Sequence, residues 1–164
     1  MPISWLIDSN VLVYAFFQRA EEPDEQDPEK KLRSDSRQVM MLAAQDAFGG
    51  AVAQQNLLEF LAIVTNPKRV VSPVDLREAL QACQAYLSFC TLVSPKPGTY
   101  LTFEALTKQR RAARERLFDL YLAATAMDNE ITQICTWNSK HFKRLAGFTV
   151  ATPSELMRSL AKSR

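Results

Sequence analysis

The sequence predicts a three-layer α/β/α fold with a central, mostly parallel sheet of four to five strands. Short apolar segments, typical of buried strands, alternate along the chain with longer segments whose apolar residues repeat at helical spacing. The chain has 164 residues, of which 47% are hydrophobic, and this length fits one domain of the usual size of roughly 100 to 200 residues. We therefore expect a single domain over residues 1–164.

The N-terminal part begins with a strand followed by a helix. Residues 3–7 form an apolar run that ends at Asp8, and residues 10–17 continue with helix-compatible spacing. Residues 21–29 are charged, contain proline and offer no apolar side chain to the core. We therefore expect a mobile acidic insertion over residues 18–33.

Helices and strands then alternate as far as the C-terminus. The next elements are expected to be a helix capped by Ser34 or Asp35 and terminated by Gly49-Gly50, a strand at residues 51–53, a helix from residue 57 to Asn66-Pro67, and a helix from Ser72-Pro73 to residue 87. The remaining ones are a minor strand at residues 92–93, a helix at 99–111 with Leu101, Phe103 and Leu106 facing inward, a helix at 117–127, strands at 131–136 and 148–150, and a last helix capped at Thr152 or Ser154.

Composition excludes some classes of protein. No apolar run approaches the roughly 20 residues of a membrane span, and no basic segment precedes an apolar one at the N-terminus, so we expect a soluble, cytoplasmic protein without a membrane partner. Cys83, Cys90 and Cys135 form no CxxC pair and no zinc pattern with His141, which favours buried thiols. A net charge of +2 does not identify a nucleic-acid binder, so any basic surface must come from local clustering.

Acidic residues stand in apolar sequence at three places near helix starts: Asp8, Glu59 and Asp119. Each also has a structural interpretation: Asp8 as a helix cap, Glu59 as an exposed first-turn residue, and Asp119 as a cap or a partner of Arg116. Together they offer the oxygen ligands that Mg²⁺ or Mn²⁺ prefers. Asp128 falls on the opposite side of its helix from Asp119, so we expect it to face solvent and not to bind metal.

These residues resemble the motifs of the PIN-domain family, and within it of the VapC-type toxins, from residue 3 to about residue 156. Asp8-Ser9-Asn10 is similar to the opening D-x-N motif, residues 55–60 to the second acidic motif, and Phe118-Asp119 with residues 123–126 to the third. The resemblance implies a PIN-like fold and a ribonuclease whose metal ion is held by Asp8, Glu59 and Asp119.

Residues 136–142 resemble the fourth motif, T-x-[DN]-x-x-D-F, with two departures. Asn138 stands where Asp is common, and His141 replaces the second Asp, which leaves a second metal site open to question. Asn138 could still bind a metal through its carbonyl oxygen or position a water. His141 could act as a general acid or contact a phosphate, or be a surface histidine of a short helix. Thr136 and Asn10 could bind an acid, a metal-bound water or the substrate, and strand-end packing explains Thr136 nearly as well.

A basic run precedes Asp119, with five Lys or Arg residues between Lys108 and Arg116. It would place positive charge beside the cleft, and Arg114 and Arg116 are candidate substrate contacts, although such runs also occur on solvated helix ends. VapC-type toxins are generally dimers held inactive by an antitoxin in a groove near the active site. The resemblance therefore implies a homodimer and a cognate antitoxin, which could use apolar surface on the helices between residues 34 and 65.

The leading hypothesis is a Mg²⁺- or Mn²⁺-dependent endoribonuclease, the toxin of a toxin–antitoxin pair, in which Asp8, Glu59 and Asp119 hold the metal and Asn138 assists. The alternative is a PIN-like RNA-binding module with weakened catalysis, motivated by Asn138 and His141. A phosphatase of the haloacid dehalogenase type, with Asp8 as nucleophile, is disfavoured because Asn10 stands where these enzymes carry a second Asp. The acidic insertion would border the cleft and limit access by repelling RNA.

Overall fold

The computed structural model describes residues 4–17, 27–109, 116–145 and 147–162, and within them five parallel strands form one sheet. The strand order is β3-β2-β1-β4-β5, and every neighbouring pair is parallel. The strands are β1 (Ser4–Ile7), β2 (Gly49–Ala53), β3 (Thr91–Val93), β4 (Gln133–Cys135) and β5 (Thr149–Ala151). This sheet confirms the predicted α/β fold with a parallel sheet of four to five strands.

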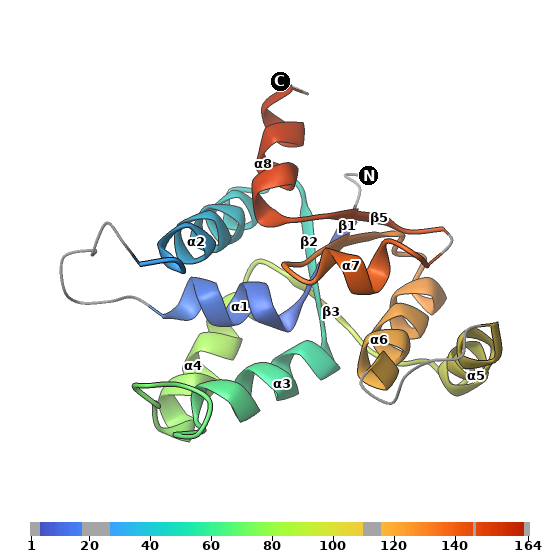
Figure 1. The fold of residues 1–164 in the computed structure, drawn as a ribbon, viewed down its shortest axis with the longest axis horizontal. Coiled ribbons are helices and arrows are strands. Elements are labelled where there is room, and N and C mark those ends of the chain that lie inside the picture. The colour runs from blue at the N-terminus through green and yellow to red at the C-terminus, as the bar shows by residue number, and fades with distance from the viewer. Residues whose placement is uncertain (1–3, 18–26, 110–115, 146, 163–164) are drawn as a thin grey trace.

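Helices cover both faces of the sheet (Figure 1). One buried cluster contains side chains from α1 (Ser9–Phe16), α2 (Lys30–Ala44), α3 (Gln54–Val64), α4 (Leu76–Leu87) and α8 (Pro153–Lys162). The other contains side chains from α5 (Thr99–Gln109), α6 (Leu117–Asp128) and α7 (Ser139–Phe142). Because successive strand residues point to opposite faces, Trp5 and Ile7 enter the first cluster and Leu6 enters the second. The result is the expected three-layer arrangement.

The middle strand, β1, is the point at which the strand order reverses. It pairs with β2 on one side and with β4 on the other. In open parallel sheets, a ligand crevice forms beyond the carboxyl ends of the strands at such a point, because the connections leave in opposite directions. The residues that follow β1, β2 and β4 are therefore placed to share one site.

Helix α2 begins before Ser34 and Asp35, which we expected to cap it. Arg33 accounts for the earlier start, because it forms ion pairs with two acidic residues that precede the helix. Residues 30–33 of the expected mobile insertion are consequently helical. Residues 18–26 of that insertion lie outside the described part of the chain.

The glycine pair does not terminate α2 as predicted, because Gly49 and Gly50 belong to β2. The chain turns earlier, at Asp46, whose φ of 54° is a conformation that aspartate adopts more readily than most residues. Gly50 lies where β2 passes α2: a Cβ there would be 3.1 Å from Sγ of Cys90 and 3.2 Å from Cβ of Ala43. This glycine therefore permits close packing of strand and helix.

Helix α4 starts later than expected. It begins after Asp75, whose side chain accepts a hydrogen bond of 2.9 Å from the backbone amide of Glu78, and not at Ser72-Pro73. Asp75 is the stronger signal because its carboxylate satisfies a backbone donor of the first turn.

The pair of helices α5 and α6 differs from expectation in two side chains. Leu101 is exposed, whereas Phe103 and Leu106 pack against the core as predicted. Asp128 does not simply face solvent: it is half-buried and accepts hydrogen bonds of 2.6 and 2.9 Å from two threonines of α5. Asp128 thus fastens α5 to the end of α6.

The structure also bears on the expectations for the cysteines and for membrane-spanning helices. The three cysteines are free and buried, which confirms the interpretation as core thiols. None of the helices in the described part of the chain combines the length and the apolar character needed to cross a membrane.

We expect Gly50→Ala to lower the free energy of unfolding by about 1–3 kcal/mol, because the added Cβ must displace Cys90 or α2, and overpacking costs about that much. Gly98→Ala is the matched control, since a Cβ there meets no atom within 4 Å, and such a change is neutral or slightly stabilising. Urea unfolding followed by circular dichroism measures both. Equal stability of the two variants would contradict the close approach of β2 and α2.

Candidate functional site

Asp8 lies at the carboxyl end of the central strand and is only 5% exposed. It caps α1 by accepting a hydrogen bond of 2.7 Å from the backbone amide of Ser9. Its other oxygen, Oδ2, accepts hydrogen bonds from Nδ2 of Asn10 at 2.9 Å and from Oγ1 of Thr136 at 2.7 Å. The cap that we considered as an alternative to a ligand role is therefore present, and it also fixes the carboxylate in one orientation.

The pKa of Asp8 is raised from 3.8 to about 6. Burial is the largest cause, the hydrogen bonds from Thr136 and Ser9 oppose the shift, and the charges of Glu59 and Asp119 contribute to it. The donors are too few to offset the loss of water around the carboxylate. Asp8 is therefore a group whose negative charge is costly to the folded protein at neutral pH.

Glu59 reaches the same region from the second turn of α3. Its Oε2 accepts a hydrogen bond of 2.6 Å from Oγ of Ser9, and its Oε1 accepts one of 2.8 Å from Nε2 of Gln55. Nε2 of Gln55 also donates to the backbone oxygen of Phe118 at 2.9 Å, which ties α3 to the first turn of α6. Glu59 is thus half-buried and bonded, and not the exposed first-turn residue of the alternative interpretation.

Asp119 stands in the first turn of α6 and is paired with His141 of α7. Nδ1 of His141 lies 2.7 Å from Oδ2 of Asp119, with the ring N–H donating to the carboxylate. Burial raises the pKa of Asp119, and Glu59 raises it too, whereas His141 and Arg116 lower it. The structure therefore brings His141 directly to the candidate site.

Thr136, fully buried after β4, connects the remaining polar residues. Its Oγ1 accepts hydrogen bonds from Nδ2 of Asn10 at 3.1 Å and from the backbone amide of Asn138 at 2.9 Å, besides donating to Asp8. Oδ1 of Asn10 in turn accepts from the backbone amide of Trp137 at 3.1 Å. This network locks the loop between β4 and α7 onto the start of α1, and it leaves the side chain of Asn138 exposed.

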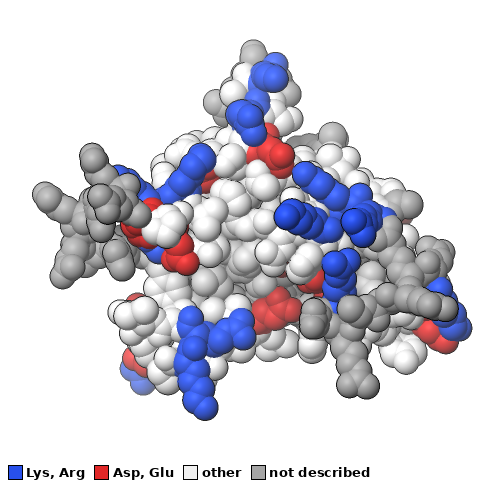
Figure 2. All heavy atoms as spheres, viewed as in Figure 1, with Lys and Arg blue, Asp and Glu red and all other residues white. Residues whose placement is uncertain are grey.

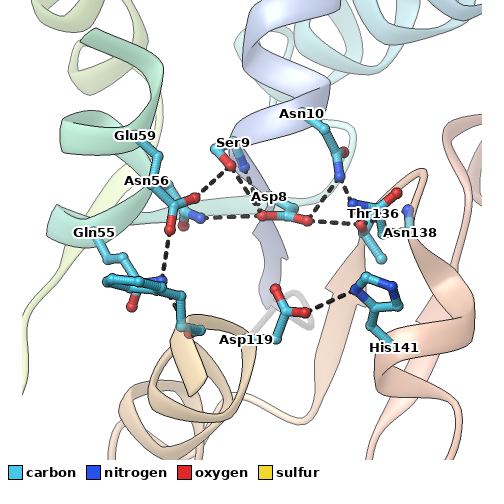
Figure 3. Close-up of polar contacts among 11 residues, drawn as sticks. Asp8, Ser9, Asn10, Gln55, Asn56, Glu59, Asp119, Thr136, Asn138 and His141 are labelled. Atoms are coloured by element: carbon cyan, nitrogen blue, oxygen red, sulfur yellow. Dashed lines mark hydrogen bonds and ion pairs between the residues drawn. The ribbon is translucent and has the colours of Figure 1, made fainter. Parts of the chain in front are cut away.

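Figure 3 shows Asp8, Glu59 and Asp119 around one region, each supplied by a different element. Oxygen ligands of this kind suit a hard divalent cation. In the described part of the chain, however, no three His, Cys, Asp or Glu side chains stand close enough together to share an ion. The site has the donor type for a metal, but all three carboxylates are engaged by hydrogen-bond partners, Asp8 and Glu59 through both oxygens and Asp119 through Oδ2.

Only part of the predicted basic run, residues 108–116, lies in the described part of the chain. Arg116 is exposed at the start of α6 and acts electrostatically on Asp119, without a direct ion pair between them in the described residues. Lys108 pairs with Glu104 of its own helix at 2.6 Å, so its charge is partly used there. Arg114 lies outside the described residues.

Sequence reasoning assigned no role to Ser9, Gln55 or Asn56, although all three contact the acids. Nδ2 of Asn56 points to Oδ1 of Asp8 at 3.4 Å, while its Oδ1 accepts from the backbone amide of Ala53 at 3.0 Å. The four-residue spacing of Gln55 and Glu59 on one helix face would have indicated their contact. The contact of Ser9 with Glu59 is long-range and carries no local signal.

The raised pKa of Asp8 predicts how stability depends on pH in the absence of metal. The folded-state pKa of about 6 exceeds the unfolded value of 3.8, so the protonated carboxyl stabilises the fold below pH 3.8, and this contribution is lost as the pH rises through about 6. The shift of roughly two units corresponds to about 3 kcal/mol.

Between about pH 4 and about pH 7, we therefore expect the free energy of unfolding of wild type to fall by up to roughly 3 kcal/mol relative to that of Asp8→Asn. Unfolding in the presence of chelator at both pH values measures this change. A ¹³C NMR titration of the carboxyl group measures the same pKa directly. A pH-independent difference between the two proteins would contradict the burial effect.

We found no match to the sequence among protein-family models or curated protein sequences. Solved structures do match. A chain of a toxin–antitoxin complex from Klebsiella pneumoniae is 20% identical, with a TM-score of 0.58, over 91% of this chain and 97% of that one. A chain of VapBC2 from Rickettsia felis, bound to a DNA fragment from their promoter, is 15% identical, with a TM-score of 0.60, over 92% and 98%.

A chain of VapBC-1 from nontypeable Haemophilus influenzae is 14% identical, with a TM-score of 0.59, over 93% of this chain and 99% of that one. At these identities the similarity concerns the fold. The chain therefore has a PIN-like fold, shared along nearly its whole length with these chains of toxin–antitoxin complexes, as the resemblance of its motifs implied.

Proposed function

We propose that this protein is a Mg²⁺- or Mn²⁺-dependent endoribonuclease and the toxin of a toxin–antitoxin pair. The observation that carries the proposal is that Asp8, Glu59 and Asp119 come from separate parts of the chain and surround one region at the carboxyl edge of the sheet, where their charges act on one another (Figure 3). The VapC-type motifs and the fold shared with chains of toxin–antitoxin complexes support it.

Asp8, Glu59 and Asp119 would hold the metal ion. Glu59 and Asp119 bind neighbouring side chains in the described conformation, so metal binding would exchange part of these hydrogen bonds for contacts with the ion. Both acids are half-buried and are not part of the buried core. A cation would also offset the repulsion that raises the pKa values of Asp8 and Asp119, which is a physical reason to keep the acids together.

The chain's own residues would hold the reacting groups in place. Asn10 and Thr136 fix Asp8, and His141 keeps one oxygen of Asp119 engaged so that the other can face the site. Asn138, exposed at the start of α7, stands where its amide can contact the scissile phosphate or a water. A divalent cation bound here supplies water of lowered pKa and charge stabilisation at the attacked phosphate.

The same proposal includes two protein partners. The matching solved structures are described as toxin–antitoxin and VapBC complexes, so we propose a cognate antitoxin for this chain, together with a homodimer. Exposed apolar side chains on α2 and α3, Met41 and Leu58, are available for such contacts.

Two observations favour the alternative, a PIN-like RNA-binding module with weakened catalysis. His141 occupies an oxygen of Asp119, and no three potential ligands among the described residues stand close enough to share an ion. If this arrangement persists in solution, the acids bind metal poorly. Metal affinity therefore separates the two functions.

Purified protein should cleave a labelled structured RNA in Mn²⁺, and Asp119→Asn and Asp8→Asn should each slow cleavage by roughly a hundredfold or more. Asp46→Asn is the matched control, because this aspartate is exposed on a turn away from the site and asparagine tolerates its positive φ. Chelator should abolish the activity. Cleavage retained in Asp119→Asn would refute the proposed active site.

We also expect Mn²⁺ to raise the unfolding temperature of wild type, because a ligand that binds only the folded state adds about 2.7 kcal/mol at a hundred times its Kd. The effect should disappear in Asp8→Asn and Asp119→Asn and persist in Asp46→Asn. A wild-type protein that binds RNA but gains no stability from Mn²⁺ would be the RNA-binding module.

A further inference from the structure

The short helix α7 carries a basic surface to which the proposed function gives no role. Lys140 and Lys143 lie in or directly after the helix, Arg144 follows them, and all three are exposed. Phe142, between the two lysines, and Leu145, directly after Arg144, are buried and anchor the segment to the core. The three cations are therefore presented on a fixed platform and not on a free loop.

The charges on this platform are largely available to a ligand. None of the ion pairs among the described residues involves Lys140, Lys143 or Arg144. Glu155 interacts with Lys143 electrostatically, but its carboxylate already accepts a hydrogen bond of 2.8 Å from the backbone amide of Thr152. One nearby acid does not balance three cations.

The position of the platform relates it to the candidate site. Helix α7 follows β4 at the carboxyl edge of the sheet and also supplies His141, which contacts Asp119. Figure 2 shows Lys and Arg side chains gathered over α7, next to acidic side chains near the centre of the same face. Arg116, exposed at the start of α6, adds a further cation close to Asp119. Positive and negative charge thus lie side by side, with the boundary at His141.

We propose that Lys140, Lys143 and Arg144 form a phosphate track that binds the backbone of a single-stranded RNA beside the carboxylates. This inference rests on the proposed ribonuclease function. It adds the path of the bound RNA strand, which runs from the carboxylates over α7. A polyanion is the ligand that three unpaired cations on a rigid platform fit best. The contacts fix the strand's register and carry no base specificity, because they reach only phosphates.

The test measures binding in chelator, so that no cleavage occurs. Fluorescence anisotropy of a short fluorescein-labelled single-stranded RNA compares wild type with the triple variant Lys140→Ala/Lys143→Ala/Arg144→Ala. The charge-matched control, Lys30→Ala/Arg77→Ala/Lys162→Ala, removes three exposed cations from other surfaces of the chain. All six positions are exposed, so both variants should fold, which circular dichroism verifies.

We expect the track variant to bind about tenfold more weakly, and the slope of log affinity against log salt to fall by about 2, since each phosphate contact to a single strand contributes about 0.7. The control should stay within about twofold of wild type. Because only binding is measured, this outcome supports the phosphate track even if the protein proves unable to cleave RNA.

Equal affinities and slopes for the two variants would overturn the proposal. So would an absence of RNA binding by wild type at low salt. Tighter binding of an acidic peptide, competing with RNA and lost in the track variant, would instead assign the surface to a protein partner and overturn it as well.

Discussion

The site is built around one buried carboxylate at the end of the central strand. Asp8 receives hydrogen bonds from α1, from the start of α3 and from the residue after β4, so the placement of these elements is coupled to a single group. Water cannot solvate a charge at this position, because the surrounding helices bury the end of the strand. The donors that hold it are therefore part of the fold as much as of the site.

The same carboxylate opposes folding once it is ionised. A shift of about two pKa units costs about 3 kcal/mol at neutral pH, a substantial part of the roughly 5–15 kcal/mol by which domains are stable. Glu59 and Asp119 contribute part of this cost because they face the same region. Stability alone gives no reason to place three acids in this region, so their presence together is the physical reason for the cation that we propose.

The fold was predictable where the signal is local, and the site only in part. Apolar runs located all five strands, and the position of Asp8 after the first run predicted the edge on which the acids meet. Two boundaries were wrong for different reasons: local ion pairs of Arg33 with the residues before α2 extend that helix, and Gly50 serves the packing of β2 against α2 instead of ending a helix. The contacts of Ser9 with Glu59 and of His141 with Asp119 join residues far apart in the chain, and no spacing in the sequence reports them.

His141 separates the two kinds of charge in the site. An acid at this position would add a further negative charge to the three carboxylates and could not donate a hydrogen bond to Asp119. The histidine instead engages Oδ2 of Asp119 and lies within the basic segment of α7, directly after Lys140. A cation would then be held on the side of β1, α3 and α6, while phosphates would be drawn to the side of α7. Because His141 stands where the motif that the sequence resembles carries an acid, the site has one acidic and one basic side, which a ring of carboxylates would lack.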